Sequence, residues 1–386
     1  MTAARTIIAL EPEIVRADER LAEVGPAWTD LWRRAGASVF QSHGWIAAWW
    51  SALADRERIG LHVALGWRGD GLEAVLPLVV ARRRGVRLLE WAARDCTDYP
   101  DALLAPGADP GLLPGLWAHL HARGGFDATL LDHLLPEARV RALVGAPAGI
   151  PGGVRLRPDH RRDVSHRLDG PFPSGAAWLA AQSKNLRRTC QRGAKAIAAR
   201  GAMRFRLLAP DEVPAALPRI AALKREALVR QGLPAPLYED DGRPLGALLR
   251  VADDLGRLRV FVLECDDLIV AAAVNFVEAD TMLAFVTTYD PDFERASPGI
   301  LLIAEYLQWS FDRGLTGLDH LRGGEPYKAR FSTRQVGLDA FSGARTVRGA
   351  AALLVDRLRH RLRDRRGTRG GPAAAPADAD DPAPAS

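Results

Sequence analysis

The stretch from Gly256 to Phe331 decides the fold. It holds three strand-like segments, Leu258-Arg-Val-Phe-Val-Leu-Glu264, Leu268-Ile-Val-Ala-Ala-Ala-Val-Asn-Phe-Val277 and Thr281-Met-Leu-Ala-Phe-Val-Thr-Thr288. Three residues separate each segment from the next. Connections that short permit antiparallel hairpins and exclude crossover helices. From Ile300 to Arg313 the apolar residues recur at helical spacing, so a helix is expected after the third strand.

The loop before this helix is rich in turn-forming residues, Tyr289-Asp-Pro-Asp-Phe-Glu-Arg-Ala-Ser-Pro-Gly299. Ser297 followed by Pro298 is typical of an N-cap with proline in the first helical position. Such a loop places free backbone N–H groups and the positive end of a helix dipole beside the sheet. This arrangement suits an anion such as the pyrophosphate of coenzyme A. An ordinary capped helix start explains the same residues about as well.

The size and composition indicate a soluble protein of two domains. The chain has 386 residues, of which 48% are hydrophobic and 26% charged. No apolar run approaches the roughly 18–20 residues that cross a bilayer. We expect the N-terminal residues 1–10 to form a first strand of a cytoplasmic protein. Cys96, Cys190 and Cys265 are far apart, so we expect reduced thiols and no metal site.

The charge pattern does not indicate nucleic-acid binding. The net charge is +5, and lysine occurs only at Lys184, Lys195, Lys224 and Lys328. A basic face with interleaved aromatic residues, as nucleic acid would require, is not found. We therefore expect no nucleic-acid partner.

The region from residue 61 to residue 91 resembles the opening stretch in length, turn size and neighbours. Three strand-like segments occur here too, and Pro77 inside the second marks an edge or a bulge. The chain therefore looks like two copies of one unit. We expect an N-terminal half at residues 1–160, a C-terminal half at 161–345, a basic helix at 346–366 and a disordered tail at 367–386.

Two helices are expected before the strand-like segments at 61–91. Residues 11–37 carry Trp28, Leu31 and Trp32 on one helical face, and Ser42 can cap a helix whose tryptophans form one broad stripe. Such an aromatic stripe is more often core than ligand site.

The predicted C-terminal helix is amphipathic and basic. Val347, Ala351, Leu354, Leu358 and Leu362 form one stripe opposite the arginines. A helix of this kind can lie on anionic lipid or on a partner. The commoner outcome is packing of the apolar stripe on its own domain, with a solvated basic face.

Short motifs in order along residues 38–340 make the chain resemble a known family. They are Phe40-Gln-Ser-His-Gly-Trp45, Leu76-Pro-Leu78, Asp98-Tyr-Pro-Asp101, Ser183-Lys-Asn-Leu-Arg-Arg188, Tyr289-Asp-Pro291, Ser297-Pro-Gly299 and Leu321-Arg-Gly-Gly-Glu-Pro-Tyr-Lys328. With these motifs the chain resembles the CelD/BcsL-type acetyltransferases, a branch of the GNAT superfamily related to the FemAB aminoacyltransferases. The resemblance implies an α/β (α+β) protein of tandem GNAT-like folds, each a mixed, largely antiparallel sheet flanked by helices.

The resemblance also implies acyl transfer and points to a phosphate loop. The expected co-substrate is an acyl-CoA, such as acetyl-CoA, and the acceptor an amine or hydroxyl of a sugar or a cell-envelope or exopolysaccharide precursor. The superfamily's loop, Arg/Gln-x-x-Gly-x-Gly/Ala, corresponds to Arg295-Ala-Ser-Pro-Gly-Ile300, which lacks the first glycine. The cofactor-binding candidates are therefore Arg295, Ser297, Gly299 and Ile300.

Acyl transfer needs a general base, an oxyanion stabiliser and an acid for the thiolate. The segment Asp319-His-Leu-Arg-Gly-Gly-Glu-Pro-Tyr-Lys328 ends a strand in a glycine turn crowded with titratable groups. Glu325 is the preferred base, and Tyr327 or Tyr289 the acid. An ion pair of Glu325 with Arg322 or Lys328 that only stabilises the turn is the competing interpretation.

The remaining candidates are substrate-binding residues. They are Asp98, Tyr99, Lys184, Arg188, Asp319, Arg322 and Lys328. For Lys184 and Arg188 a solvated helix face is the default, and for Asp98 and Tyr99 a plain turn is almost as good an explanation.

Two other functions remain open. One is FemAB-like transfer from aminoacyl-tRNA, which long helical arms and a large basic surface would favour. The other is a degenerate GNAT scaffold that assists polysaccharide biosynthesis at the inner membrane face through residues 346–366.

Overall fold

The computed structural model describes residues 11–54, 56–144 and 155–367. The predicted strand within residues 1–10 and the predicted disordered tail after Gly367 lie outside the described residues. The elements of the N-terminal half are β1 (Glu11–Val15), α1 (Asp18–Glu23), α2 (Gly25–Ala35), η1 (Val39–Gln41), α3 (His43–Ala52), η2 (Arg56–Arg58), β2 (Ile59–Leu61), β3 (Val63–Arg68), β4 (Gly71–Leu76), β5 (Leu78–Arg83), β6 (Val86–Trp91), β7 (Leu103–Leu104), α4 (Leu112–Arg123), β8 (Ala128–Leu134), η3 (Arg139–Leu143) and β9 (Arg157–Pro158).

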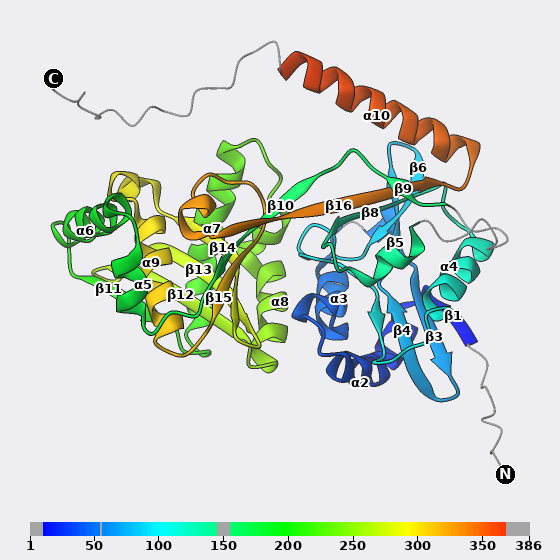
Figure 1. The fold of residues 1–386 in the computed structure, drawn as a ribbon, viewed down its shortest axis with the longest axis horizontal. Coiled ribbons are helices and arrows are strands. Elements are labelled where there is room, and N and C mark those ends of the chain that lie inside the picture. Colours follow the sequence, from blue (N-terminus) through cyan, green and yellow to red (C-terminus); the bar gives the residue numbers. More distant parts are fainter. Residues whose placement is uncertain (1–10, 55, 145–154, 368–386) are drawn as a thin grey trace.

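The C-terminal half carries the longer strands (Figure 1). Its elements are β10 (Asp163–Asp169), α5 (Gly175–Ala181), α6 (Lys184–Ala198), β11 (Met203–Leu207), α7 (Val213–Arg230), η4 (Pro236–Tyr238), η5 (Asp240–Gly242), α8 (Arg243–Asp254), β12 (Leu258–Cys265), β13 (Leu268–Glu278), β14 (Thr281–Tyr289), η6 (Pro291–Ala296), α9 (Pro298–Phe311), β15 (Gly317–Arg322), η7 (Lys328–Phe331), β16 (Arg334–Ala344) and α10 (Val347–Gly367). The predicted meander is confirmed, since β12, β13 and β14 pair antiparallel in sequence order.

One sheet runs through both halves. Within the described residues it has 12 strands, in the order β11-β12-β13-β14-β15-β10-β16-β8-β6-β5-β2, with β9 also on β16. The long strand β16 connects the halves because its first residues pair with β10 and its last with β8. A strand that belongs to both halves couples their folding, and the division at residue 160 stays a prediction.

Pro77 separates two sheets, so the prediction of a single meander at 61–91 is wrong. β3 and β4 lie in a second, four-stranded sheet within the described residues, and β5 and β6 lie in the long sheet. Proline cannot donate a ladder hydrogen bond, so the strand breaks where it leaves one sheet for the other. The predicted helix at 11–37 is likewise corrected to the strand β1 followed by the two helices α1 and α2.

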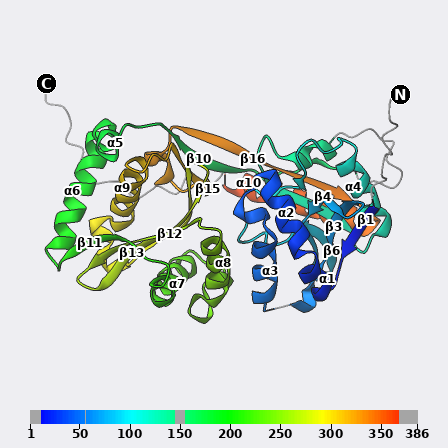
Figure 2. The same cartoon turned by 90° about the horizontal axis from the view of Figure 1, so that it is seen from below.

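Helices cover both faces of the C-terminal sheet (Figure 2): α5, α6 and α9 lie on one side, and α7 and α8 on the other. The α3 helix of the first half packs against α8, and the Ser42 hydroxyl caps α3 as predicted, accepting from the Trp45 N–H at 3.2 Å. Trp45 and Phe40 are buried against Phe276 of β13. The aromatic motif of the first half is therefore core, and it joins the two halves.

The C-terminal helix α10 corrects another expectation. Gly349 faces the sheet, where an added Cβ would lie 1.9 Å from the Asp127 carbonyl oxygen. Its leucine stripe is exposed instead of packing on its own domain. The side of the helix turned to the protein bears Gly349, Ala352, Leu353 and Asp356.

Candidate functional site

The parallel strands β14 and β15 separate and leave a wedge between them. They pair only at their starts, Thr281 with Gly317 through Leu283 with Asp319. Beyond Leu283 the strand β14 continues to Tyr289 with no partner on that side among the described residues. Backbone groups on an unpaired strand edge are free to bind an extended ligand, as in strand-addition complexes. We refer to this space as the wedge.

A β-bulge lies where β14 enters the wedge. Val274 pairs with Val286 and Asn275 with Ala284, which leaves Phe285 as the extra residue. The Phe285 ring packs on Phe276 and on the Trp45 of the first half. Bulges bend a strand and are frequent next to active sites. Here the bend turns the end of β14 away from β15.

The turn after β15 brings Glu325 and Lys328 together. Their side chains form an ion pair at 2.8 Å, and the Lys328 ammonium also donates to the Arg322 carbonyl at 2.6 Å. Gly323 has a φ of 114°, and a Cβ there would lie 2.4 Å from Glu325 Oε2. The predicted ion pair is therefore present, and only glycine leaves room for it.

Lys224 of α7 reaches the same place from the other side. Its ammonium donates to the Thr287 carbonyl at 3.2 Å, within the unpaired part of β14. Burial lowers the pKa of Lys224, as does the charge of Lys328, while Glu325 opposes the shift. Burial would raise the pKa of Glu325, but the hydrogen bond and charge of Lys328, together with Lys224, lower it. The site thus holds an ionised carboxylate between two amines.

The phenol of Tyr327 lies beside the Thr287 side chain at the wedge. Burial, with the nearby charge of Glu325, raises the pKa of Tyr327, and the hydrogen bond with Thr287 opposes that rise. A tyrosine in this setting keeps its proton at neutral pH. It can therefore donate that proton to a developing anion.

Buried polar atoms on the α9 side of the sheet lack partners among the described residues. They include the Tyr306 hydroxyl, the His320 Nε2 and both polar atoms of the Asn275 amide. His320 packs against the Tyr327 ring. Its pKa falls to about 3 because of burial and the charges of Lys328 and His166, so it is neutral. Unpaired buried polar groups are costly, and a ligand with amides and a thioester carbonyl would supply their partners.

The loop before α9 has the predicted position but a different local geometry. Ser297 is the N-cap residue and Pro298 follows it, yet the Ser297 side chain makes no capping hydrogen bond and its φ is 50°. Gly299 faces the Tyr289 ring, and a Cβ added at Gly299 would lie 3.5 Å from that ring. Arg295 is exposed and Ile300 half-buried beside them. The first-turn N–H groups of α9 are thus left for an anion.

Tyr289 belongs to this loop and not to the Glu325 turn. Its hydroxyl donates to Glu294 at 3.5 Å, and burial followed by the Glu294 charge raises its pKa. The predicted acid candidates therefore occupy two places, Tyr327 at the wedge and Tyr289 near the start of α9.

The Asp98-Tyr99 segment of the first half binds the end of β15. The Tyr99 hydroxyl donates to Asp319 at 2.7 Å, and Asp98 pairs with the Arg322 Nε at 3.1 Å. Asp319 also accepts from the Ser165 hydroxyl at 2.9 Å and pairs with Arg167 at 2.8 Å. Burial raises the pKa of Asp98, against the charge of Arg322. The two halves are joined here by buried charges.

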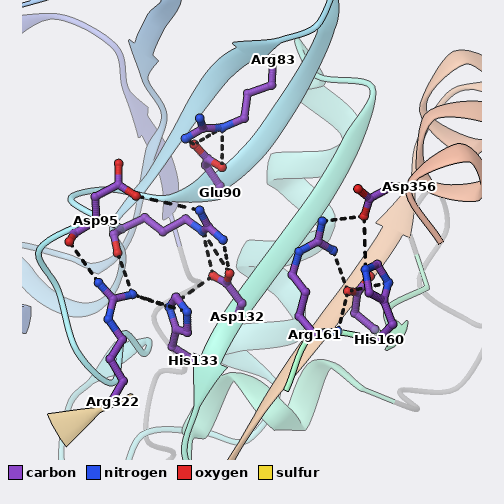
Figure 3. A network of polar contacts seen from close by, with 11 residues as sticks. Arg83, Glu90, Asp95, Asp132, His133, His160, Arg161, Arg322 and Asp356 are labelled. Carbon is purple, nitrogen blue, oxygen red and sulfur yellow. Dashed lines mark hydrogen bonds and ion pairs between the residues drawn. The ribbon is translucent and has the colours of Figure 1, made fainter. Parts of the chain in front are cut away.

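The guanidinium of Arg322 is engaged within the protein (Figure 3). It donates to the carbonyls of Arg94 and Asp95 at 3.3 and 3.0 Å, and it contacts His133 at 2.9 Å. Beside it Arg94 pairs with the buried Asp132. These contacts connect β15 to the first half and leave few Arg322 donors for a substrate.

A cavity of about 480 Å³ lies between the halves at the paired start of β14 and β15. Its lining includes Tyr99, Arg167, Glu278, Asp319 and Arg334. Glu325, Tyr327 and Lys328 are not part of the lining. The cavity and the Glu325 turn therefore lie on two sides of the Asp319 junction.

Two substrate-binding candidates remain apart from this group. Lys184 and Arg188 are exposed on α6, and Figure 1 shows this helix at the outer end of the C-terminal half. The α6 residue that meets the phosphate-loop region is Gly193, whose Cβ would lie 2.3 Å from the Ala296 carbonyl.

Sequence reasoning missed Lys224, Asn275, Tyr306 and His320. Lys224 had one usable signal, since it is one of four lysines in a chain whose basic residues are nearly all arginine. Asn275 and Tyr306 sit in apolar runs, where a buried polar residue is more often satisfied core than site. His320 lies in the titratable segment 319–328, but no role was predicted for it. Among the described residues no group of three or more His, Cys, Asp or Glu side chains is arranged to hold a metal.

Residues 184–329 match the model of the acetyltransferase (GNAT) domain. The matched segment contains the wedge, the loop before α9 and the Glu325 turn. Residues 184–329 therefore form a GNAT acetyltransferase domain, and this match supports an acyltransferase enzyme. No curated protein matches the chain in sequence.

Solved structures agree on the fold. The C-terminal domain (DUF2156) of a protein described as a lysylphosphatidylglycerol synthetase from Agrobacterium fabrum has a TM-score of 0.51 at 14% identity, covering 88% of this chain and 96% of its own. FemX has a TM-score of 0.54 at 8% identity, covering 86% of this chain and 97% of its own. The chain thus shares its overall fold with these two structures, and its mixed, largely antiparallel sheet flanked by helices is the architecture predicted from the sequence.

Proposed function

We propose that the protein transfers an acyl group, acetyl in the simplest case, from acyl-CoA to an amine or hydroxyl of a sugar or of a cell-envelope or exopolysaccharide precursor. The observation that carries the proposal is the group of Glu325, Lys328, Lys224 and Tyr327 at the unpaired end of β14. A carboxylate base and a protonated phenol at one strand edge are the two proton-transfer groups that thioester aminolysis needs.

In this proposal the acyl-pantetheine arm extends along the unpaired edge of β14. Three buried groups that lack partners within the described residues hydrogen-bond to this arm: the Asn275 amide, the Tyr306 hydroxyl and the neutral His320. The pyrophosphate binds at the start of α9, with Arg295, Ser297, Gly299 and Ile300 around it. The acceptor approaches Glu325 from solvent, because the Glu325 side chain is about half exposed.

The reaction follows from these positions. Glu325 takes the proton from the acceptor amine or hydroxyl as the new bond to the acyl carbon forms. The carbon–sulfur bond then breaks, and Tyr327 gives its proton to the departing thiolate. Lys328 keeps Glu325 ionised and oriented, and Lys224 adds positive charge near the developing oxyanion. Tyr289, Asp98, Lys184 and Arg188 remain candidates for contacts with the two substrates.

We place this enzyme in the cytoplasm, with peripheral contact to the inner membrane face through residues 346–366 as part of the proposal. Among the described residues no helix is long and apolar enough to span a bilayer.

Titration calorimetry with acetyl-CoA tests the donor. We expect a Kd on the order of 1 μM to 1 mM, the range usual for enzyme substrates. Ser297→Asp should weaken binding roughly tenfold, because a carboxylate at the helix start repels the pyrophosphate. Aspartate tolerates the left-handed backbone of this position. Ser51→Asp, on the exposed end of α3, is the matched control and should bind normally.

No binding at millimolar acetyl-CoA would exclude the acyl-CoA donor and favour an aminoacyl-tRNA donor or a scaffold. Binding that is equally strong in Ser297→Asp would exclude the start of α9 as the phosphate site.

Gly323→Ala tests the turn. A Cβ at this position would displace the Glu325 carboxylate, so turnover should fall at least tenfold while acetyl-CoA binding stays. Gly314→Ala is the control, because Gly314 also has a positive φ but open space around it. Both variants should lose about 1–2 kcal/mol of stability in urea denaturation. Equal turnover in the two variants would contradict the role of the turn.

A further inference from the structure

The outer face of α10 is the most apolar exposed surface of the described residues. Nine large hydrophobic residues are exposed among the described residues, and five of them belong to α10: Val347 at 88%, Leu354 at 57%, Val355 at 44%, Leu358 at 47% and Leu362 at 57%. We refer to these five as the α10 stripe. Leu354, Leu358 and Leu362 recur every four residues and so lie along one side of the helix. Single exposed leucines need no explanation, but a continuous stripe does.

The opposite side of α10 faces the rest of the protein, with Gly349 buried and Leu353 half-buried, and it makes several polar contacts. Asp356 pairs with Arg161 at 2.6 Å and with His160 at 3.5 Å (Figure 3). The His160 and His360 rings stack with centroids 4.3 Å apart, and Arg357 donates to the Ser342 hydroxyl at 3.3 Å. The helix is therefore anchored by its polar side. Because these contacts hold the opposite side against the protein, the apolar stripe faces outward.

Arginines border the stripe on both sides. Arg361 lies on one flank of the leucines, and Arg348 and Arg359 lie on the other, by their helical positions; all three are exposed. The acidic Asp356 is turned inward to Arg161. From Arg345 to Arg369 the sequence has nine arginines and two aspartates. The outer face combines leucines with positive charge.

This combination favours one class of partner. In a pair of identical helices packed stripe to stripe, the flanking arginines would face arginines, and like charges in contact are unfavourable. An anionic lipid surface satisfies both features, since leucines enter the acyl boundary and arginines bind phosphate headgroups. Figure 1 shows α10 along the outer edge of the molecule, where the sheet does not shield it.

We propose that the α10 stripe docks the enzyme on an anionic membrane surface, with the helix axis in the plane of the membrane. This inference is independent of the acyl-transfer chemistry, because it needs no acyl-CoA and no turnover. In most amphipathic helices of this kind the apolar stripe is buried on its own domain, whereas here it is available to the membrane.

Vesicle co-sedimentation of the full chain tests the docking. Wild type should sediment with phosphatidylglycerol–phosphatidylcholine vesicles and not with pure phosphatidylcholine vesicles, and binding should weaken at high salt. Two variants should each lower partitioning onto these vesicles roughly tenfold or more. One is the triple variant Leu354→Ser, Leu358→Ser, Leu362→Ser, and the other is the double variant Arg359→Glu, Arg361→Glu. Leu207→Ser with Leu268→Ser, which removes exposed leucines from β11 and from the start of β13, is the matched control and should bind as wild type.

Circular dichroism and urea denaturation establish that each variant is folded. Absence of wild-type binding to phosphatidylglycerol vesicles would overturn the proposal. A second result would also overturn it: light scattering in the absence of lipid shows that the wild type is a dimer and the triple variant a monomer. The stripe would then be a contact between copies of this chain. Loss of vesicle binding in both stripe variants, with a monomeric wild type, supports it.

Discussion

Replacing Glu325 with glutamine is expected to lower kcat by roughly 10²–10⁴-fold, the usual contribution of a general base. The amide keeps the shape of the side chain and the contact with Lys328 but cannot accept a proton. Acetyl-CoA binding, measured by calorimetry, should be unchanged, since the proposed donor contacts lie along β14 and α9. Turnover equal to wild type would remove Glu325 from the mechanism.

The pH profile of wild-type kcat adds a check with a defined sign. The pKa of Glu325 is lowered, so the base stays ionised as pH falls, and kcat should decline only below the usual titration range of a glutamate. Lys224→Met removes one of the two cations that lower this pKa. The acidic limb of its profile should therefore move to higher pH. If the acidic limb of the Lys224→Met profile does not move, Lys224 does not influence the pKa of Glu325.

Replacing Asp319 with alanine is expected to destabilise the protein by roughly 3–5 kcal/mol, the cost of breaking a buried ion pair by removing one partner. The variant leaves Arg167 without its carboxylate and the Tyr99 and Ser165 hydroxyls without their acceptor. The free energy of unfolding from urea denaturation measures this loss. Because Asp319 joins the halves, unfolding should also become less cooperative between them.

Asp30→Ala is the control for that measurement. Asp30 forms an exposed ion pair with Arg34 at 2.8 Å on α2, and such pairs contribute about 0–1 kcal/mol. Similar losses in Asp319→Ala and Asp30→Ala would show that the junction is not a major source of stability. Asp319 would then be free for a role in substrate binding alone.

Backbone strain is also found at this junction. Tyr99, Leu321 and His133 have φ angles of 54°, 57° and 59°, which side-chain-bearing residues seldom adopt. Strain of this kind persists where surrounding contacts hold it, and such positions cluster at active sites. The Asp98–Arg322 and Tyr99–Asp319 contacts hold it here. The junction therefore fixes the end of β15, from which the Glu325 turn starts.

Much of the fold was predictable because its signals are local. Three-residue connections required the hairpins of β12, β13 and β14, and Ser42 marked the start of α3. Pro298 placed the start of α9 for the same reason, since proline fits the first turn of a helix. Each of these signals acts within a few residues along the chain.

The candidate site was only partly predictable. The Glu325–Lys328 pair is three residues apart in sequence and was expected, whereas Lys224 reaches Thr287 across 63 residues. The Tyr99–Asp319 contact spans 220 residues. Nothing near Lys224 in the sequence distinguishes it from a solvated lysine on a helix. Its place depends on how α7 packs against β14, which is a property of the whole core.

The sequence from Gly256 to Phe331 by itself determined the meander, the helix that follows it and the charged glycine turn, because hairpin length, capping and glycine geometry are local constraints. Only the tertiary structure decided that β16 serves both halves and that β14 separates from β15 at a bulge. It also decided that the α10 stripe faces outward, because on the other side of the helix Gly349 packs against Asp127 and Asp356 pairs with Arg161. Periodicity shows that a helix has an apolar side, but the competition among all packing contacts decides what that side meets.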